Sequence, residues 1–471
     1  MKDRREFLKT SCRALSMAAL ATQMRHFGLI NALAQDKEID NASGGNYKAL
    51  VCVFLAGGND SNNTVVPNYD AGYGQYAAAR QSQGLAIARS SLLSISPASL
   101  SGQTYGFHPS MTDLHTLWGQ NKLAVVCNVG TLMQPLTRAQ YQSGAARPMQ
   151  LFSHTNQVEQ FKTAISNYSS PTGWGGRLSD RTANQNGGAA IPMISQLSSG
   201  ANVFTVGNNS TPLIVAPAPT PLNQLLTLNG FGTATDDFAR RTAMNNIRQA
   251  DLNYTLTQAA SALTQQAINV SQQLSSDPAL TVTFPNTALG NQLQQVAKLM
   301  KFRSQLNMSR QVFYVQLGGF DTHGNQLTNH ASLWTQVSQA LKAFYDETVA
   351  QGISTDVTTF TMSDFNRTLN PSGSGSGVGT DHAWGGHHLV IGDSVLGGNF
   401  YGRPTANGTI FPTLVNAGPD DAETRGRLIP SVSVEQYAAT LARWFGLSQN
   451  DIPLVFPNIN SFSGSDLGFM I

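Results

Sequence analysis

Four strand-like runs divide the chain and predict one central sheet. The first, Ala49 to Ala56, is apolar at every position, and the others span residues 123–129, 312–317 and 355–362. A run that is apolar at successive positions is typical of a strand covered on both faces. Such strands belong to sheets with helices on either side. The pattern therefore predicts an α/β fold with a central, mostly parallel sheet flanked by helices on both faces.

Helical periodicity fills the spaces between these runs. Residues 287–308 place Leu289, Leu293 and Val296 on one face of a helix, and residues 236–274 predict one or two amphipathic helices with a Gln-rich outer surface. A short strand is predicted at residues 202–206. We expect residues 46–471 to form one domain, with a cap or insertion around residues 201–280.

Metal-ligating side chains follow three of the predicted strands. Asp60 comes after the first run, Asp321 and His323 after the third, and Asp364 after the fourth. An open α/β sheet binds its ligands at the carboxyl ends of its strands. Asp321 and His323 are two residues apart, so in an extended chain they point the same way. Asp60 also suits an ordinary turn after two glycines, and that alternative stays open.

A fourth stretch, Thr380 to His388, reads Thr-Asp-His-Ala-Trp-Gly-Gly-His-His. Imidazole and carboxylate are the usual protein ligands of zinc and related divalent metals. Neighbouring glycines let the backbone turn tightly enough to direct them at one point. A polar loop with surface histidines is the alternative. Taken with the three strand ends, this stretch predicts a centre with one or two metals at a common edge of the sheet.

Two further positions are candidates for chemistry. Ser153, with His154 beside it, is the catalytic candidate, since it stands at a predicted helix N-terminus, which stabilises a developing anion and suits a nucleophile. An ordinary N-cap explains the same serine. Arg367, three residues after Asp364, could bind two oxygens of a phosphate or sulfate group. Its alternative role is to pair with a structural carboxylate.

Residues 1–34 are predicted to be a twin-arginine signal peptide. Arg4 to Lys9 reads Arg-Arg-Glu-Phe-Leu-Lys, a weakly apolar run follows, and Ala32-Leu33-Ala34 offers a cleavage site. We expect the twin-arginine translocase to export the protein to the periplasm or the medium. No other stretch approaches the ~20 apolar residues of a membrane span, so we expect none in the mature chain.

The charge and cysteine content of the chain bear on which partners it could bind. Without the signal peptide the chain keeps 23 of its 29 basic and 25 of its 27 acidic residues. A balance so close to neutral gives no support for binding to nucleic acid. Cys52 and Cys127 lie in strand-like runs and are expected to be buried thiols, with a disulfide as the weaker alternative. The sequence contains no cysteine-based zinc motif.

Five motifs together resemble an exported bacterial family called domain of unknown function 1501, within the alkaline phosphatase and sulfatase superfamily. They are Gly-Gly-Asn-Asp (57–60), Gly-Trp-Gly-Gly-Arg-Leu (173–178), Gly-Gly-Phe-Asp-Thr-His (318–323), Ser-Asp-Phe-Asn-Arg-Thr (363–368) and Asp-His-Ala-Trp-Gly-Gly-His-His (381–388). The resemblance runs from about Lys48 to beyond Arg403. It implies an alkaline phosphatase-like sheet with a metal site at its strand ends.

The resemblance also implies roles for individual residues. Asp60 matches the first metal aspartate of the superfamily, Asp321 and His323 its next pair, and His387 or His382 its final histidine. Phe365 stands where the superfamily has a second histidine after its aspartate, which leaves the number of metals open. We therefore expect a divalent metal, zinc first, with calcium, magnesium and manganese as alternatives. The expected ligands are Asp60, Asp321, His323, Asp364, His382 and His387.

Two functions compete on these grounds. The first is an exported metal-dependent hydrolase of phosphate or sulfate esters, on a small molecule or a polymer, with Ser153 or a metal-bound water as nucleophile and Arg367 holding the anion. The second is a catalytically silent exported binding or assembly protein with the same fold. A serine hydrolase with a Ser-His-Asp triad is a weaker reading, since the Gly-x-Ser-x-Gly turn is missing.

Overall fold

The computed structural model describes residues 47–471, apart from residues 101, 199, 201, 225–233, 251, 253–254 and 275. The predicted signal peptide lies outside the described residues. Among the described helices, none is both long enough and apolar enough to cross a membrane.

A nine-stranded sheet forms the centre of the molecule. Its strand order is β11-β5-β10-β9-β1-β8-β6-β7, with β12 paired to β5. The pairs β10–β5 and β10–β9 are antiparallel and the other pairs are parallel. The strands are β1 (Lys48–Leu55), β5 (Leu123–Gly130), β6 (Ile194–Gln196), β7 (Leu213–Ile214), β8 (Arg310–Leu317), β9 (Val357–Ser363), β10 (Gly386–Ile391), β11 (Phe400–Tyr401) and β12 (Val432–Ser433). All four predicted runs are strands of this sheet, and the predicted fold class is confirmed.

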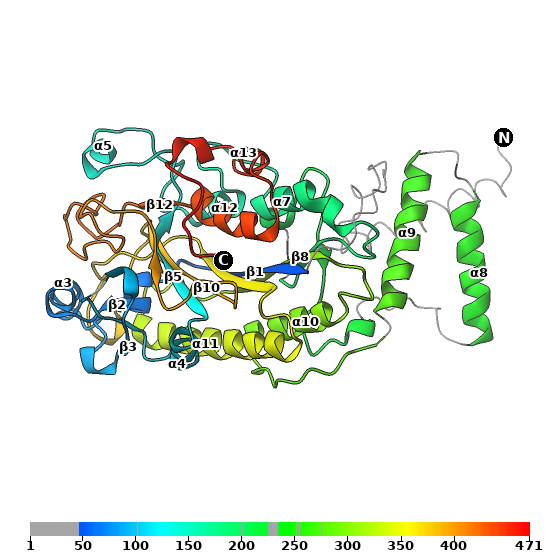
Figure 1. Ribbon diagram of the computed structural model, residues 1–471, viewed down its shortest axis with the longest axis horizontal. Helices are drawn as coiled ribbons and strands as arrows, with labels where there is room; N and C mark the ends of the chain where they lie inside the picture. Colours follow the sequence, from blue (N-terminus) through cyan, green and yellow to red (C-terminus); the bar gives the residue numbers. More distant parts are fainter. Residues whose placement is uncertain are drawn as a thin grey trace.

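Helices cover both faces of the sheet (Figure 1). The helices are α2 (Ser61–Thr64), α3 (Asp70–Arg80), α4 (Thr112–Gly119), α5 (Arg138–Gln142), α6 (His154–Thr163), α7 (Trp174–Thr182), α8 (Thr235–Gln249), α9 (Thr255–Gln273), α10 (Ala288–Lys301), α11 (Gln326–Ala350), α12 (Val434–Phe445) and α13 (Ile452–Val455). In Figure 1, α7 and α12 lie above the sheet, and α4, α10 and α11 below it. A small antiparallel sheet of β2 (Val65–Pro67), β3 (Leu93–Ile95) and β4 (Tyr105–Phe107) follows β1.

The two-sided burial of β1 explains its unbroken apolar sequence. Alternate residues, such as Val51 and Val53, join the core that contains α10 and α11, while Cys52 and Phe54 join the core that contains α7 and α12. Both remaining cysteines are buried and free, as the packing interpretation predicts.

Strand register brings the predicted functional loops to one edge. Leu55, at the end of β1, pairs with both Leu317 of β8 and Ser363 of β9. The chain therefore leaves all three strands at the same level. Because β10 runs antiparallel to β9, its first residue, Gly386, lies toward that same edge. Residues 381–385, just before Gly386, consequently meet the loops that follow β1, β8 and β9.

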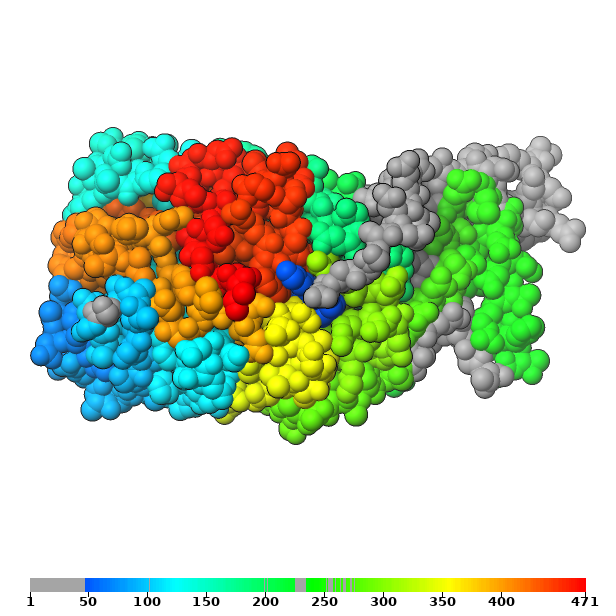
Figure 2. All heavy atoms as spheres, viewed as in Figure 1, coloured from blue at the N-terminus to red at the C-terminus, as the bar shows by residue number. Residues whose placement is uncertain are grey.

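The region of residues 201–280 differs in detail from the prediction. The predicted strand at residues 202–206 is wrong, because Val203–Thr205 is a 3-10 helix whose Asn202 side chain accepts a hydrogen bond from the Phe204 N–H. The predicted helices are present as α8 and α9. In Figure 1 this pair lies at the right, whereas β2 and α3, which follow β1, lie at the left. Figure 2 shows α8, in green, extending beyond the main body. The pair therefore lies away from the predicted site.

Candidate metal centre

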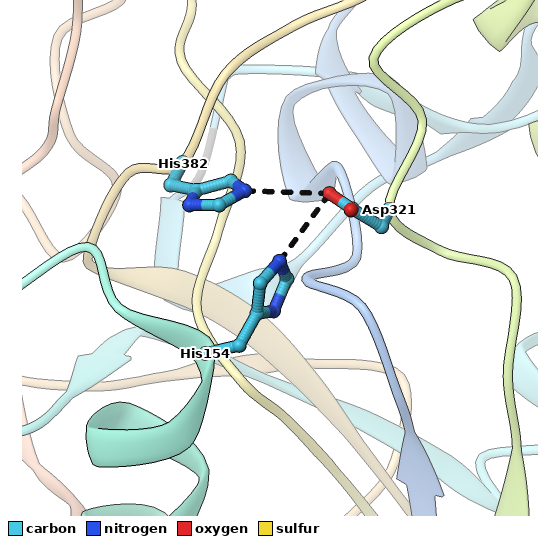
Figure 3. A group of neighbouring side chains, drawn as sticks. All are labelled: His154, Asp321 and His382. Carbon is cyan, nitrogen blue, oxygen red and sulfur yellow. Dashed lines mark ion pairs between the residues drawn. The ribbon is translucent and has the colours of Figure 1, made fainter.

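Three side chains from distant segments meet at the strand-end edge. His154 is the first residue of α6, Asp321 follows β8, and His382 precedes β10. Their ligand atoms, one from each residue, all lie within 4.8 Å of one another. Figure 3 shows both imidazole rings directed at the Asp321 carboxylate. We call these three residues the His-Asp-His cluster.

Hydrogen bonds behind the two histidines fix their orientation. The His154 Nδ1 lies 2.8 Å from Asp364 Oδ2, and the His382 Nδ1 lies 2.7 Å from the Phe152 carbonyl oxygen. Since a carboxylate and a carbonyl only accept, both Nδ1 atoms carry the proton, and each neutral ring then presents an Nε2 lone pair. The His154 Nε2 is buried and has no hydrogen-bond partner. This arrangement is typical of metal-ligating histidines.

The separations within the cluster suit a small cation. Asp321 Oδ1 lies 3.5 Å from His154 Nε2 and 3.4 Å from His382 Nε2. Tetrahedral ligands at about 2 Å from zinc lie ~3.3 Å from one another. Two imidazole nitrogens and a carboxylate oxygen are also borderline-to-hard ligands that suit zinc and related divalent ions. The residues present therefore fit a divalent metal.

His323 extends the cluster on its exposed side. Its Nε2 lies 3.1 Å from Asp321 Oδ1 and 3.0 Å from His382 Nε2. Its Nδ1 lies 3.3 Å from Asp381 Oδ1, and Asp381 is itself paired with Arg425 at 2.6 Å. These distances place a third imidazole beside two members of the cluster. The predicted ligand role of His323 stays a prediction.

Local charges favour the ionised carboxylate. Burial alone would raise the pKa of Asp321, but the hydrogen bond and positive charge of Arg367 lower that pKa below its ordinary value. The hydrogen bond to Asp364 raises the pKa of His154, against the opposing effect of burial. Burial lowers the pKa of His382. Asp321 is thus negative and His382 neutral near pH 7, as metal ligation requires.

Asp364, predicted as a ligand, lies behind the cluster. Its Oδ1 accepts a hydrogen bond from the Gly57 N–H at 2.9 Å, and its Oδ2 accepts the His154 Nδ1 proton. Both oxygens are therefore occupied, and the side chain is only 4% exposed. In this geometry Asp364 holds the His154 ring in place, and its predicted role as a metal ligand stays a prediction.

Arg367, predicted to bind the substrate anion, is fully buried. Its Nη1 lies 2.5 Å from Asp321 Oδ1 and 3.3 Å from the Gly57 carbonyl oxygen, and its Nε donates to Thr380 Oγ1 at 3.2 Å. Its Nη2 donates to the Thr380 carbonyl oxygen. The guanidinium is thus occupied within the protein, and the alternative role, pairing with a carboxylate, is the one that the structure shows.

Asp60, the first predicted ligand, forms a buried ion pair. Its Oδ2 lies 2.6 Å from Arg80 Nη1 and its Oδ1 lies 3.0 Å from Arg80 Nη2, with both side chains fully buried. Gln326 also donates to Oδ2. Asp60 is thus paired with Arg80 through both carboxylate oxygens, and its predicted role as a metal ligand stays a prediction. Nothing in the sequence pattern around Arg80 indicates this pairing.

His387 also stands apart from the cluster. Its ring stacks on Phe411 at 4.6 Å between centroids, and its Nδ1 accepts a hydrogen bond from the Asn128 N–H at 3.1 Å. Burial lowers its pKa to about 3, so the ring is neutral. The structure places His387 in the core, and of the two alternative final histidines it brings His382 to Asp321.

Ser153 occupies the N-cap position of α6, as predicted, but its side chain does not cap the helix. The hydroxyl donates to Asn156 Oδ1 at 3.0 Å. Ser153 directly precedes His154, so it borders the cluster. Its role as nucleophile stays a prediction.

The cluster opens to solvent. The side chains of His154, Asp321 and His382 are 34%, 43% and 24% exposed. A cavity of about 590 Å³ is lined by other residues, among them Leu132, Arg403 and Phe462. The three side chains of the cluster are not among the residues that line this cavity.

Comparison with known proteins identifies the family. Residues 47–452 match the family described as protein of unknown function (DUF1501). The chain belongs to this family. The match covers the whole His-Asp-His cluster. No curated protein matches the chain.

Solved structures similar to this family member are distant. They include Ps i-CgsB in complex with k-i-k-neocarrahexaose (10% identity, 88% of this chain and 77% of that chain, TM-score 0.34). A second is the PsFucS1 sulfatase from Pseudoalteromonas sp. (9% identity, 76% of this chain and 64% of that chain, TM-score 0.28). A third is the alkaline phosphatase of the Antarctic bacterium TAB5 (8% identity, 74% of this chain and 91% of that chain, TM-score 0.25). The chain spans less than two thirds of the sulfatase. Likenesses this weak carry no argument about activity, and the fold class rests on the sheet itself.

Proposed function

We propose that this protein is a metal-dependent hydrolase of phosphate or sulfate esters. The observation that carries the proposal is the convergence of two imidazole Nε2 atoms, each fixed by a hydrogen bond from Nδ1, on the ionised Asp321 carboxylate. His154, Asp321 and His382 would hold the cation, with His323 beside them. Three protein ligands with an open side are typical of catalytic zinc sites, whereas structural sites are closed.

Each residue around the proposed cation has a separate role. A divalent cation supplies Lewis-acid stabilisation of negative charge on the ester oxygens. Asp364 keeps the His154 proton on Nδ1, and Arg367 keeps Asp321 ionised by pairing with it at 2.5 Å. Ser153 directly precedes His154 in the chain and is the candidate nucleophile. The exposed side of the cluster admits the ester.

The occupied arginines favour a second candidate, a catalytically silent binding protein. Arg367 and Arg80, both fully buried, are committed to Asp321 and Asp60, so neither guanidinium is available to a substrate anion. A hydrolase of this kind needs positive charge at the ester, which the metal alone would then provide. The alternative is accordingly a metal-binding protein without ester hydrolysis.

A measurement of metal binding tests whether the cluster holds a metal, which both candidate functions require. We expect the purified protein to bind about one equivalent of zinc in a competition titration, and Asp321→Ala to lose that binding. His115→Ala serves as the matched control, because His115 lies on α4 and bonds the Ser94 carbonyl oxygen, away from the cluster. Wild-type protein that binds neither zinc, calcium, magnesium nor manganese would refute the proposal.

A panel of chromogenic phosphate and sulfate esters then tests catalysis. We expect turnover by the zinc-loaded protein, and Ser153→Ala should remove it while zinc binding persists. Full activity in Ser153→Ala would indicate that a water molecule, and not Ser153, is the nucleophile. Zinc binding without turnover of any ester would leave the binding-protein function.

We also propose export by the twin-arginine route, which rests on residues 4–9 and on the cleavage site at residues 32–34. Replacing Arg4 and Arg5 by Lys should hold the precursor in the cytoplasm of a bacterial host. Unchanged levels of that variant in the periplasm would contradict export by this route.

A further inference from the structure

One side chain outside the His-Asp-His cluster touches the segments of both histidines. The Arg427 Nε donates to the His382 carbonyl oxygen at 3.0 Å. Its guanidinium carbon lies 3.9 Å from the centre of the Phe152 ring. Phe152 is two residues before His154, and its own carbonyl oxygen accepts the His382 Nδ1 proton at 2.7 Å. Arg427 therefore braces the two histidine-bearing segments against each other.

Phe152 has a backbone conformation that needs such support. Its φ is 71°, in the left-handed region that bulky residues rarely adopt. Strained backbone of this kind persists only where the surroundings hold it, and it concentrates at functional sites. The Phe152 N–H donates to Gln157 Oε1 at 2.6 Å, and Arg427 lies over the ring. A cation at this distance from an aromatic face is attracted to it.

Arg427 is itself held in place. Its Nη1 lies 2.8 Å from Glu423 Oε2, and its side chain is 19% exposed. Its backbone N–H donates to Asp421 Oδ1 at 3.0 Å. The fully buried Asp421 also accepts hydrogen bonds from the backbone N–H groups of Ala417, Glu423 and Gly426. The loop of residues 417–427 is thus built around Asp421 and presents Arg427 to the segments that carry His154 and His382.

We propose that Arg427 is a positioning residue of the metal centre. It fixes Phe152 and His382 together, and so sets the separation of the His154 and His382 Nε2 atoms on which metal affinity depends. This inference rests on the proposed function, because it requires that the cluster binds a metal. Partners behind the ligands typically change metal affinity by 10–100-fold when removed.

Arg427→Met tests the proposal against a matched control, Arg138→Met. Arg138 supports the same loop, since its Nη1 and Nη2 donate to the carbonyl oxygens of Gly418 and Glu423 at 2.7 and 2.6 Å. It makes no such bond to Phe152 or His382 in the described structure. The readouts are the zinc dissociation constant, the visible absorption of the cobalt(II) form, which reports ligand geometry, and the urea midpoint.

We expect Arg427→Met to weaken zinc binding by about 10–100-fold and to alter the cobalt spectrum. Arg138→Met should lower the urea midpoint yet leave zinc affinity within about twofold. An Arg427→Met protein with wild-type affinity and spectrum overturns the inference, and so does an equal loss in Arg138→Met. If Arg427→Met does not fold, Arg427→Lys takes its place in the test. The zinc affinity of Arg427→Lys should then be lower than that of the wild type, by a smaller factor. A wild-type protein that binds none of zinc, calcium, magnesium and manganese rejects the proposed function instead.

Discussion

At the scale of single residues, the site depends on which nitrogen of each histidine carries the proton. Asp364 and the Phe152 carbonyl accept from Nδ1 of His154 and His382, so each neutral ring presents the Nε2 lone pair that a metal would bind. Residue type alone did not predict that Asp321 faces the two Nε2 atoms while Asp364 accepts a hydrogen bond from behind His154. Asp364 and Asp321 are both acids at strand ends, and only their surroundings distinguish them.

Replacing Asp364 by Asn should therefore weaken zinc binding by about 10–100-fold. An amide has one acceptor, so it cannot serve both the Gly57 N–H and the His154 Nδ1–H, which the two carboxylate oxygens now accept. Isothermal titration with zinc would measure the change. Asp393→Asn is the control, since Asp393 is similarly bonded to Tyr345 and Ser354 but lies outside the cluster. Equal affinities in the two variants would refute the role of Asp364.

A second residue-scale prediction concerns Glu435, whose buried Oε2 has no hydrogen-bond partner. Burial raises its pKa to about 7, so the fold favours the neutral acid. The resulting stability is fully present below the unfolded pKa of about 4.5 and is lost as the pH rises through about 7. The free energy of unfolding of Glu435→Gln should equal that of the wild type at pH 4 and exceed it at pH 8 by roughly 1–3 kcal/mol. Urea unfolding at both pH values measures this, and a constant difference would contradict it.

At the scale of elements, the register of the sheet explains why much of the site could be predicted. Asp321, His323 and His382 meet because β8 ends level with β1 and β9, while the antiparallel β10 begins near that edge. Apolar runs reveal such strands in the sequence. They do not reveal that Arg80, at the end of α3, neutralises Asp60, or that a loop built on Asp421 supplies Arg427. Those pairings join segments that share no periodic signal.

Close packing of elements gives the third prediction. A Cβ on Gly176, in α7, would lie 2.0 Å from the Val206 carbonyl carbon, so the helix can approach residues 203–207 only without a side chain. Gly176→Ala should cost roughly 1–3 kcal/mol of unfolding free energy or more. Gly74→Ala is the matched control, because a Cβ on this α3 glycine has nothing within 4 Å. That change should stabilise the helix by ~0.5–1 kcal/mol. Similar denaturation midpoints for the two variants would contradict the packing argument.

At the scale of the whole molecule, a metal would connect segments far apart in the chain. His154 begins α6, Asp321 follows β8, and His382 precedes β10, so one ion would join all three. Zinc at 100 times its dissociation constant should stabilise the folded protein by about 2.7 kcal/mol, provided that the unfolded chain does not bind it. Removing zinc with a chelator should lower the melting temperature accordingly, and Asp321→Ala should show no such shift.

The stabilisation should also be local, because ligation restrains the segments that carry the ligands and α8 and α9 lie at the opposite end of the molecule (Figure 1). Hydrogen exchange compared with and without zinc should therefore slow in residues 150–157, 318–323 and 380–385, and stay unchanged in α8. A uniform slowing that includes α8 would indicate a metal bound elsewhere or a global effect. Slowing confined to the three segments, and absent in Asp321→Ala, would locate the metal at the strand ends where the chain brings its histidines together.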